Sequence, residues 1–169
     1  MAVSLYDITI PVFQRGLGTL GALLNKGRAF AATEGIDHAD LLGARLAPDM
    51  LPLTGQVQRA SDTAKFAMVR VGGVPNEAFA DDEKSFEDLA DRIARTRAFL
   101  ADVPRSAIEG REAAVISATI GRTPVTLSGR DYVLGFALPN FFFHVTTAYD
   151  ILRHRGVPVG KMDYIGPLS

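Results

Sequence analysis

The sequence predicts an all-α protein, an antiparallel four-helix bundle with a small β-hairpin inserted before the last helix. Apolar residues recur at alternating steps of three and four in four separate segments, which is the spacing of one stripe along a helix. A period-two run interrupts this pattern between residues 112 and 128. The length of 169 residues, 47% of them hydrophobic, suits one ordinary domain with a buried core, so we expect residues 1–169 to form a single domain.

The first helix is expected at about residues 3–31, where the apolar stripe runs from Val3 to Leu24. Pro11 lies inside this stripe and should kink the helix or mark a break. The following segment, residues 33–47, is long enough to be the crossover connection of a bundle.

The second helix is expected at about residues 49–71, because the next stripe runs from Met50 to Val71. Asp49 suits the first turn of this helix, since a carboxylate is favourable near the positive end of the helix dipole. Two consecutive glycines follow Val71 and should end the helix.

The third helix is expected at about residues 85–101, because Ser85 and Asp88 have the spacing of a capping box. The period-two run that follows predicts a hairpin at about residues 113–128, with Gly121 at its turn. This hairpin would lie between the third and fourth helices.

The fourth helix is expected at about residues 130–154, with an apolar stripe from Leu134 to Leu152. The tail that follows, residues 156–169, contains several glycines and prolines. We expect it to be irregular, because both residue types interrupt regular structure.

Composition excludes several classes of function. The 18 Lys plus Arg residues nearly balance the 19 Asp plus Glu residues, so no basic surface is expected for nucleic acid or an anionic membrane. No apolar run approaches the roughly 18 residues of a membrane-spanning helix. The absence of cysteine excludes a disulfide framework, a thiolate metal site and a cysteine nucleophile. No signal-peptide pattern follows Met1, so we expect a cytoplasmic protein.

A glycine motif on the first helix resembles a dinucleotide-binding loop. Gly16, Gly18 and Gly21 match the pattern G-x-G-x-x-G. The helical stripe runs straight through these glycines and no later strand-helix-strand units build a parallel sheet, so we reject the nucleotide interpretation. Each glycine inside a helix costs about 1 kcal/mol relative to alanine. The expected reason is the close approach of a neighbouring helix or a second subunit.

Polar residues on the second and fourth helices form the candidate site. His144 flanks the stripe of the fourth helix, and Asn140 lies one turn before it. Asp49 and Gln56 flank the stripe of the second helix and are expected to face the other two residues across the bundle. One interpretation is a pocket for a small molecule. The other is a buried network of hydrogen bonds in which the polar groups satisfy one another.

A divalent metal at this site would depend on His144 together with Asp49 or Gln56. Zinc sites in proteins use three or four His, Cys or carboxylate ligands, and calcium or magnesium needs more oxygen atoms than these side chains offer. The sequence therefore favours the absence of a metal cofactor over a degenerate metal site.

The other charged side chains are interpreted as solvent-exposed. His38 lies in a polar run and His154 at the end of the fourth helix. Three arginines of the third helix are expected to form a solvated face with local ion pairs to the acids of that helix: Arg92, Arg95 and Arg97.

The residues of the fourth helix also carry a family resemblance. The segment PNFFFHVTTAYDILRHRGVP, residues 139–158, resembles the signature of the bacterial family called domain of unknown function nineteen-ninety-three. The segments LAPDMLPL at residues 46–53 and GKMDYIG at residues 160–166 resemble the same family. That family is grouped with the DinB and YfiT-like bundles, so the resemblance implies an up-down-down-up arrangement of helices with a long crossover.

The resemblance also bears on metal binding and assembly. Many members of this superfamily hold a divalent metal with one histidine on the second helix and a His-x-x-x-His pair on the fourth. That pair falls on Asn140 and His144, and the second helix offers Asp49 or Gln56 in place of a histidine. The resemblance makes a homodimer the expected assembly. Two functions stay open: a small-molecule-binding protein or enzyme, and a non-catalytic homodimeric module with a structural, interaction or stress-response role.

Overall fold

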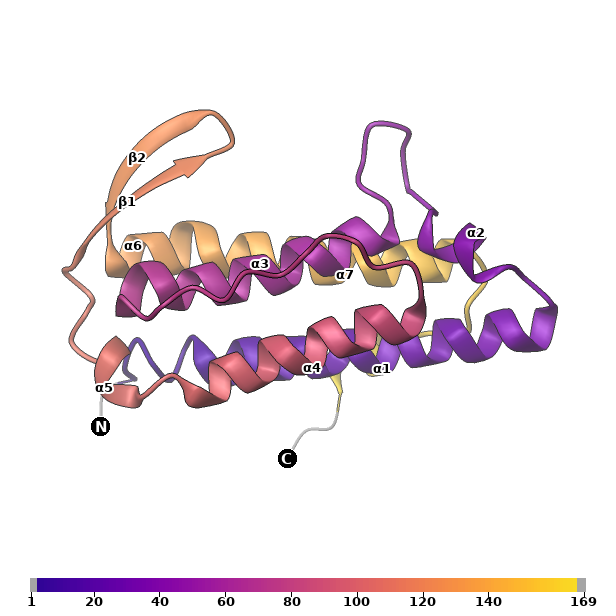
Figure 1. Ribbon diagram of the computed structural model, residues 1–169, viewed down its shortest axis with the longest axis horizontal. Helices are drawn as coiled ribbons and strands as arrows, with labels where there is room; N and C mark the ends of the chain where they lie inside the picture. Colours follow the sequence, from indigo (N-terminus) through magenta and orange to yellow (C-terminus); the bar gives the residue numbers. More distant parts are fainter. Residues whose placement is uncertain (1–2, 167–169) are drawn as a thin grey trace.

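The computed structural model describes residues 3–166 and is mostly helical, with one two-stranded sheet. Its long helices lie side by side along the long axis of the molecule (Figure 1). They are α1 (Ile10–Glu34), α3 (Leu53–Gly72), α4 (Phe86–Asp102) and α7 (Leu138–His154). Helix α3 packs against α4 and α7, and α1 packs against the same two helices. Each long helix therefore buries its apolar stripe against two others.

Shorter elements connect the long helices. They are α2 (His38–Leu42), α5 (Arg105–Ile108), β1 (Val115–Ile120), β2 (Thr123–Ser128), α6 (Gly129–Tyr132), a π-helical turn (Val133–Ala137) and α8 (Lys161–Ile165). The hairpin and the α2–α3 connection project from the same side of the molecule (Figure 1). Within residues 3–166, no helix combines the length and the apolar character needed to cross a membrane.

Helix α1 begins at Ile10, and the prediction of a start near residue 3 is wrong. Pro11 occupies the first turn, where its missing N–H costs no hydrogen bond and its fixed φ suits a helix start. The preceding residues form turns, in which the Thr9 hydroxyl donates to the Leu5 carbonyl at 2.8 Å. Val3 is 74% exposed, so the apolar spacing before Pro11 is not the face of a helix.

Helix α3 begins at Leu53, later than the expected residue 49. Pro52 has an extended backbone with ψ of 171°, and a proline also disfavours helical geometry in the residue before it. Asp49 therefore lies in the connection between α2 and α3, where its side chain is exposed. The short helix α2 is capped by Asp37, whose carboxylate accepts from the Ala39 N–H at 2.9 Å.

Helix α4 begins directly after Ser85 and has the expected capping box. The Ser85 hydroxyl accepts from the Asp88 N–H, and the Asp88 carboxylate accepts from the Ser85 N–H, both at 3.0 Å. The hairpin pairs β1 with β2 in antiparallel register, from Val115 opposite Ser128 to Ile120 opposite Thr123.

The expected fourth helix is one continuous run from α6 through the π-helical turn to α7. In the wide turn the Leu138 N–H bonds the carbonyl of Val133, just before Pro139, which has no N–H to donate. This turn rotates the apolar stripe, so Val133 is buried and Leu134 is 46% exposed. The prediction that Leu134 opens the buried stripe is therefore wrong.

The tail is more regular than expected. It contains helix α8, whose first turn is closed by the Asp163 carboxylate accepting from the Gly160 N–H at 2.8 Å. The last part of the predicted irregular segment, residues 167–169, lies outside the described residues.

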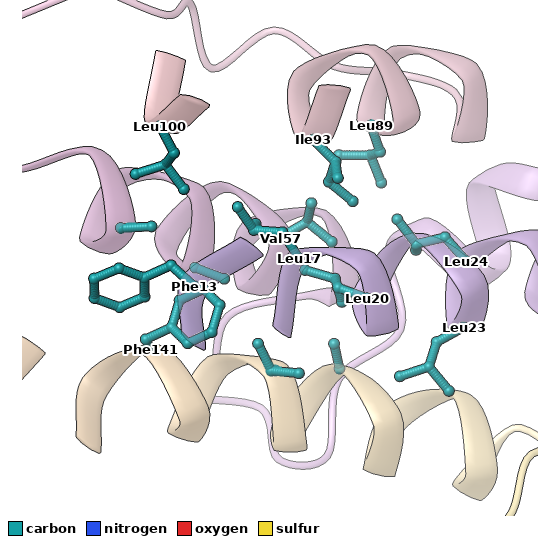
Figure 2. Close-up of a cluster of buried hydrophobic side chains, with 14 of the residues drawn as sticks. Phe13, Leu17, Leu20, Leu23, Leu24, Val57, Leu89, Ile93, Leu100 and Phe141 are labelled. Atoms are coloured by element: carbon teal, nitrogen blue, oxygen red, sulfur yellow. The ribbon is translucent and has the colours of Figure 1, made fainter. Parts of the chain in front are cut away.

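One glycine of the G-x-G-x-x-G pattern permits close packing. Figure 2 shows α1 between α4 and α7, with Phe13 and Phe141 side by side in the core. A Cβ at Gly16 would lie 2.8 Å from Cζ of Phe141 and closer still to Cε1, so a side chain there collides with α7. A Cβ at Gly18 would meet nothing within 4 Å. The close approach explains Gly16 and leaves Gly18 without a packing reason.

Candidate functional site

Two of the predicted site residues, Gln56 of α3 and His144 of α7, are directly bonded. Nδ1 of His144 lies 2.8 Å from Oε1 of Gln56. The other end of the Gln56 amide donates from Nε2 to the Leu51 carbonyl at 3.0 Å. Gln56 is 1% exposed and His144 is half-buried. A hydrogen bond, and not an open space, therefore joins these side chains.

These contacts determine which nitrogen of His144 carries the proton. The Leu51 carbonyl only accepts hydrogen bonds, so the NH₂ end of the Gln56 amide faces Leu51 and the oxygen faces the imidazole. Because that oxygen also only accepts, Nδ1 of His144 must be the donor. In the neutral ring, Nε2 then keeps its lone pair and can accept a hydrogen bond or bind a ligand.

The surroundings keep the His144 ring neutral. Burial, together with the positive charge of nearby Arg59, lowers the pKa of His144 from 6.5 to about 4. Near neutral pH the ring is thus an uncharged hydrogen-bond acceptor. A pKa this low makes Nε2 a weak base, since efficient general bases have a pKa near the working pH.

Asn140 belongs to a neighbouring contact of the same two helices. Its Nδ2 donates to the Thr63 hydroxyl at 2.7 Å, and that hydroxyl donates to the Arg59 carbonyl at 2.6 Å. Asn140 and His144 lie one helical turn apart on α7. The two contacts therefore form a polar seam along the α3–α7 interface, which we define as Gln56, Thr63, Asn140 and His144.

Asp49 does not join the polar seam. Its side chain is exposed in the α2–α3 connection, ahead of the first turn of α3. Among the described hydrogen bonds of the seam, none involves its carboxylate. Asp49 was predicted to flank the helical stripe because the apolar spacing continues before Pro52, whereas the helix begins after it.

The residues of the seam do not fit a divalent metal. In the part of the chain that the structure describes, no group of three or more His, Asp or Glu side chains is close enough to hold an ion. The Gln56 oxygen already accepts from His144, which leaves Nε2 of His144 as the available nitrogen ligand. The positive charge of Arg59 also acts on this ring and opposes a second cation. Of the other two expected donors, Gln56 is bonded to the His144 ring itself, and Asp49 lies in the α2–α3 connection outside the seam.

A second polar cluster lies between α3 and α4, where the sequence predicted a solvated surface. The side chain of Arg92 is 2% exposed and forms ion pairs with carboxylates of Glu83 at 2.7 Å, Asp62 at 2.9 Å and Asp81 at 3.0 Å. The prediction that Arg92 is solvated is therefore wrong. Arg95 is exposed as expected, although its carboxylate partner at 3.0 Å is Glu77 and not an acid of its own helix.

The acids around Arg92 come largely from the irregular connection between α3 and α4, residues 74–85, which we call the strap. Lys65 of α3, also 2% exposed, donates to the Glu77 carbonyl of the strap at 2.7 Å, with its Nζ 4.0 Å from the centre of the Phe79 ring. Burial lowers the pKa of Lys65. Burial alone would raise the pKa of Glu83, and hydrogen bonds from Arg92 and Gln58 outweigh it, so that pKa is lowered. The cluster fastens the strap to both helices.

The remaining histidines have local roles. His38 is half-buried at the start of α2, with its ring edge against Phe86 at a centroid distance of 5.2 Å. His154 is exposed in the last turn of α7.

Comparisons with known proteins agree with this architecture. The family model DUF1993, described as a domain of unknown function, matches residues 5–165. A DinB family member protein from Shewanella denitrificans has a crystal structure similar to this chain with a TM-score of 0.89, at 38% sequence identity over 97% of this chain and 93% of that chain. No curated protein matches the chain. With nearly its whole length covered by the family model, this chain belongs to the DUF1993 family of DinB-like proteins.

Proposed function

We propose that this protein is an up-down-down-up four-helix bundle that binds a small polar molecule at the polar seam without a resident metal. The strap supports the topology, because in Figure 1 it runs back alongside α3 from the end of that helix to the start of α4. The long crossover is then the strap, residues 74–85. The segment at residues 33–47, which the sequence suggested for this role, instead carries α2.

The observation that carries the binding proposal is the bond between Gln56 and His144. Gln56 holds the imidazole in one tautomer, and burial keeps it neutral, so Nε2 is presented as an acceptor of fixed orientation. Functional sites commonly hold a group that meets the ligand through a second residue that orients it. A ligand with an N–H or O–H donor fits this acceptor, and a cation does not, because Arg59 lies nearby.

A thermal-shift screen of small polar metabolites and low-molecular-weight thiols tests this proposal on tag-free protein. We expect at least one compound to raise the melting temperature, and we expect the shift to disappear in His144→Phe. His154→Phe is the matched control, because His154 is exposed on the same helix and outside the seam. A stabilising compound that acts equally on the His144 variant would contradict the proposal.

Metal content is tested on the same protein. After incubation with Zn²⁺, Ni²⁺ or Mn²⁺ and gel filtration, elemental analysis should show well below one ion per chain, because the seam offers one nitrogen ligand. Stoichiometric metal that is lost in His144→Phe would overturn the metal-free interpretation.

A homodimeric module without catalytic activity is the second candidate. One observation favours it: α7 exposes large apolar side chains, with Phe143 55% exposed and Phe142 36% exposed. Exposed aromatic residues are typical anchors of protein interfaces. Sedimentation analysis of the wild type and Phe143→Ser tests it, because a dimer that uses this face should dissociate in the variant. A monomeric wild type would contradict it.

A further inference from the structure

An apolar cavity of about 210 Å³ lies between α1, α7 and α8, and we call it the tail cavity. Its walls are mostly apolar or aromatic: Val12, Gly16 and Thr19 from α1, Phe142 and Val145 from α7, and Tyr164 from α8. The cavity lies on the α1 side of α7, whereas His144 is bonded to α3. It therefore shares no residue with the polar seam.

Helix α8 is held over this cavity by contacts at its edges. The Thr19 hydroxyl donates to the Tyr164 carbonyl at 3.3 Å, and the Tyr164 hydroxyl lies 2.9 Å from the Thr146 hydroxyl. Lys26 of α1 pairs with Asp163 of α8 at 2.7 Å. These polar contacts hold α8 against α1 and α7. The space beneath α8, next to Val12, Gly16 and Val145, remains empty and forms the cavity.

One cation lines the cavity. Arg15 donates from Nη2 to the Ile165 carbonyl at 2.6 Å, and its side chain is exposed. Over residues 3–166, the ion pairs of the structure include no carboxylate within 4.0 Å of this guanidinium. A guanidinium has five N–H donors and prefers a planar, bidentate partner such as a carboxylate. Arg15 thus offers positive charge beside an apolar cavity.

We propose that the tail cavity binds a small aromatic carboxylate, with its ring between Phe142 and Tyr164 and its carboxylate on Arg15. The size fits, because an apolar protein cavity of about 150 Å³ accommodates benzene, and the tail cavity is larger. Aromatic walls favour an aromatic ligand through edge-to-face and offset contacts. Ligand sites typically combine an apolar cavity with a few polar groups that fix orientation, and Arg15 is such a group here.

Sodium benzoate is the probe, and amide chemical shifts of ¹⁵N-labelled full-length protein are the readout. We expect saturable shifts that centre on Val12, Thr19 and Val145. Benzyl alcohol, which has the ring without the charge, should bind about tenfold more weakly, because it loses the charge-assisted bonds to Arg15. Benzoate shifts that centre on Gln56 and His144 would overturn the proposal, and so would an absence of saturable shifts.

Variants separate the charge from the cavity. Arg15→Gln should weaken benzoate binding about tenfold and leave benzyl alcohol unchanged. Val12→Phe should fill the cavity and abolish binding of both probes. Val115→Phe is the matched control for Val12→Phe, because Val115 is an exposed valine of β1 that does not line the cavity. Wild-type benzoate affinity in Arg15→Gln or in Val12→Phe would refute the assignment. This outcome does not depend on whether the polar seam binds a ligand.

Discussion

Gly16 and Gly18 lie in the same helix, yet an added methyl group should change stability in opposite directions. In an exposed helix interior, Gly→Ala stabilises a protein by about 0.5–1 kcal/mol, because alanine loses less backbone entropy on folding. Gly18→Ala should show this gain, since nothing lies within 4 Å of the new Cβ. Gly16→Ala makes the same entropic gain and in addition forces its methyl group against Phe141.

The structure sets the size of the penalty at Gly16. The methyl group would lie 2.8 Å from Cζ of Phe141, where ordinary contacts begin at 3.4 Å. The ring of Phe141 is fully buried and stacks edge-to-face on Phe13 at 5.0 Å, so it cannot turn away freely. Overpacking of this kind costs about 1–3 kcal/mol. Gly16→Ala should therefore be about 1–3 kcal/mol less stable than Gly18→Ala.

Urea denaturation followed by circular dichroism measures this difference directly. In thermal unfolding, 1 kcal/mol corresponds to about 2–4 °C in melting temperature for a domain of this size. The two variants should therefore melt about 2–12 °C apart. Equal stability of the two alanine variants would refute the packing argument, because it would mean that α1 and α7 separate at no cost.

Two further predictions concern buried charge. His144 has a folded-state pKa of about 4, below its ordinary 6.5, so its contribution to stability is fully present above pH 6.5 and is lost as the pH falls towards 4. The free energy of unfolding should fall across that range by up to about 3 kcal/mol, and His144→Asn should lose this part of the pH dependence while His154→Asn keeps it. In the strap, Glu83→Gln should destabilise the protein by about 1–3 kcal/mol, because buried Arg92 loses a charged partner. Glu87→Gln, which removes an exposed ion pair, should change the free energy of unfolding by less than about 0.5 kcal/mol, and an equal effect of both substitutions in urea denaturation would contradict the distinction.

Sequence patterns predicted the helices well where a local signal fixes each end. Ser85 and Asp88 bond each other within one turn, so four consecutive residues contain the whole capping motif. The pattern failed where a proline interrupts an apolar stripe. Pro11 and Pro52 each mark the start of a helix, while the apolar spacing continues through them and suggests a longer one.

Tertiary contacts account for most of the errors in the site. Arg92 is three residues after Leu89 and four before Thr96, so the helical spacing places it on the buried face of α4. It was predicted to be solvent-exposed because its side chain is charged. Its partners at Asp62 and Glu83 are distant in sequence, and no local pattern joins them. Gln56 and His144 were predicted to face each other, and the structure adds the direct bond and the tautomer that this bond selects.

The strap also has a consequence for local unfolding. Connections without regular secondary structure commonly open at a small free-energy cost, and proteases cut them first. Opening the strap would expose Lys65 and Arg92 and separate both from their partners in a single step. Limited proteolysis should therefore cut the hairpin turn or the α2–α3 connection before it cuts the strap.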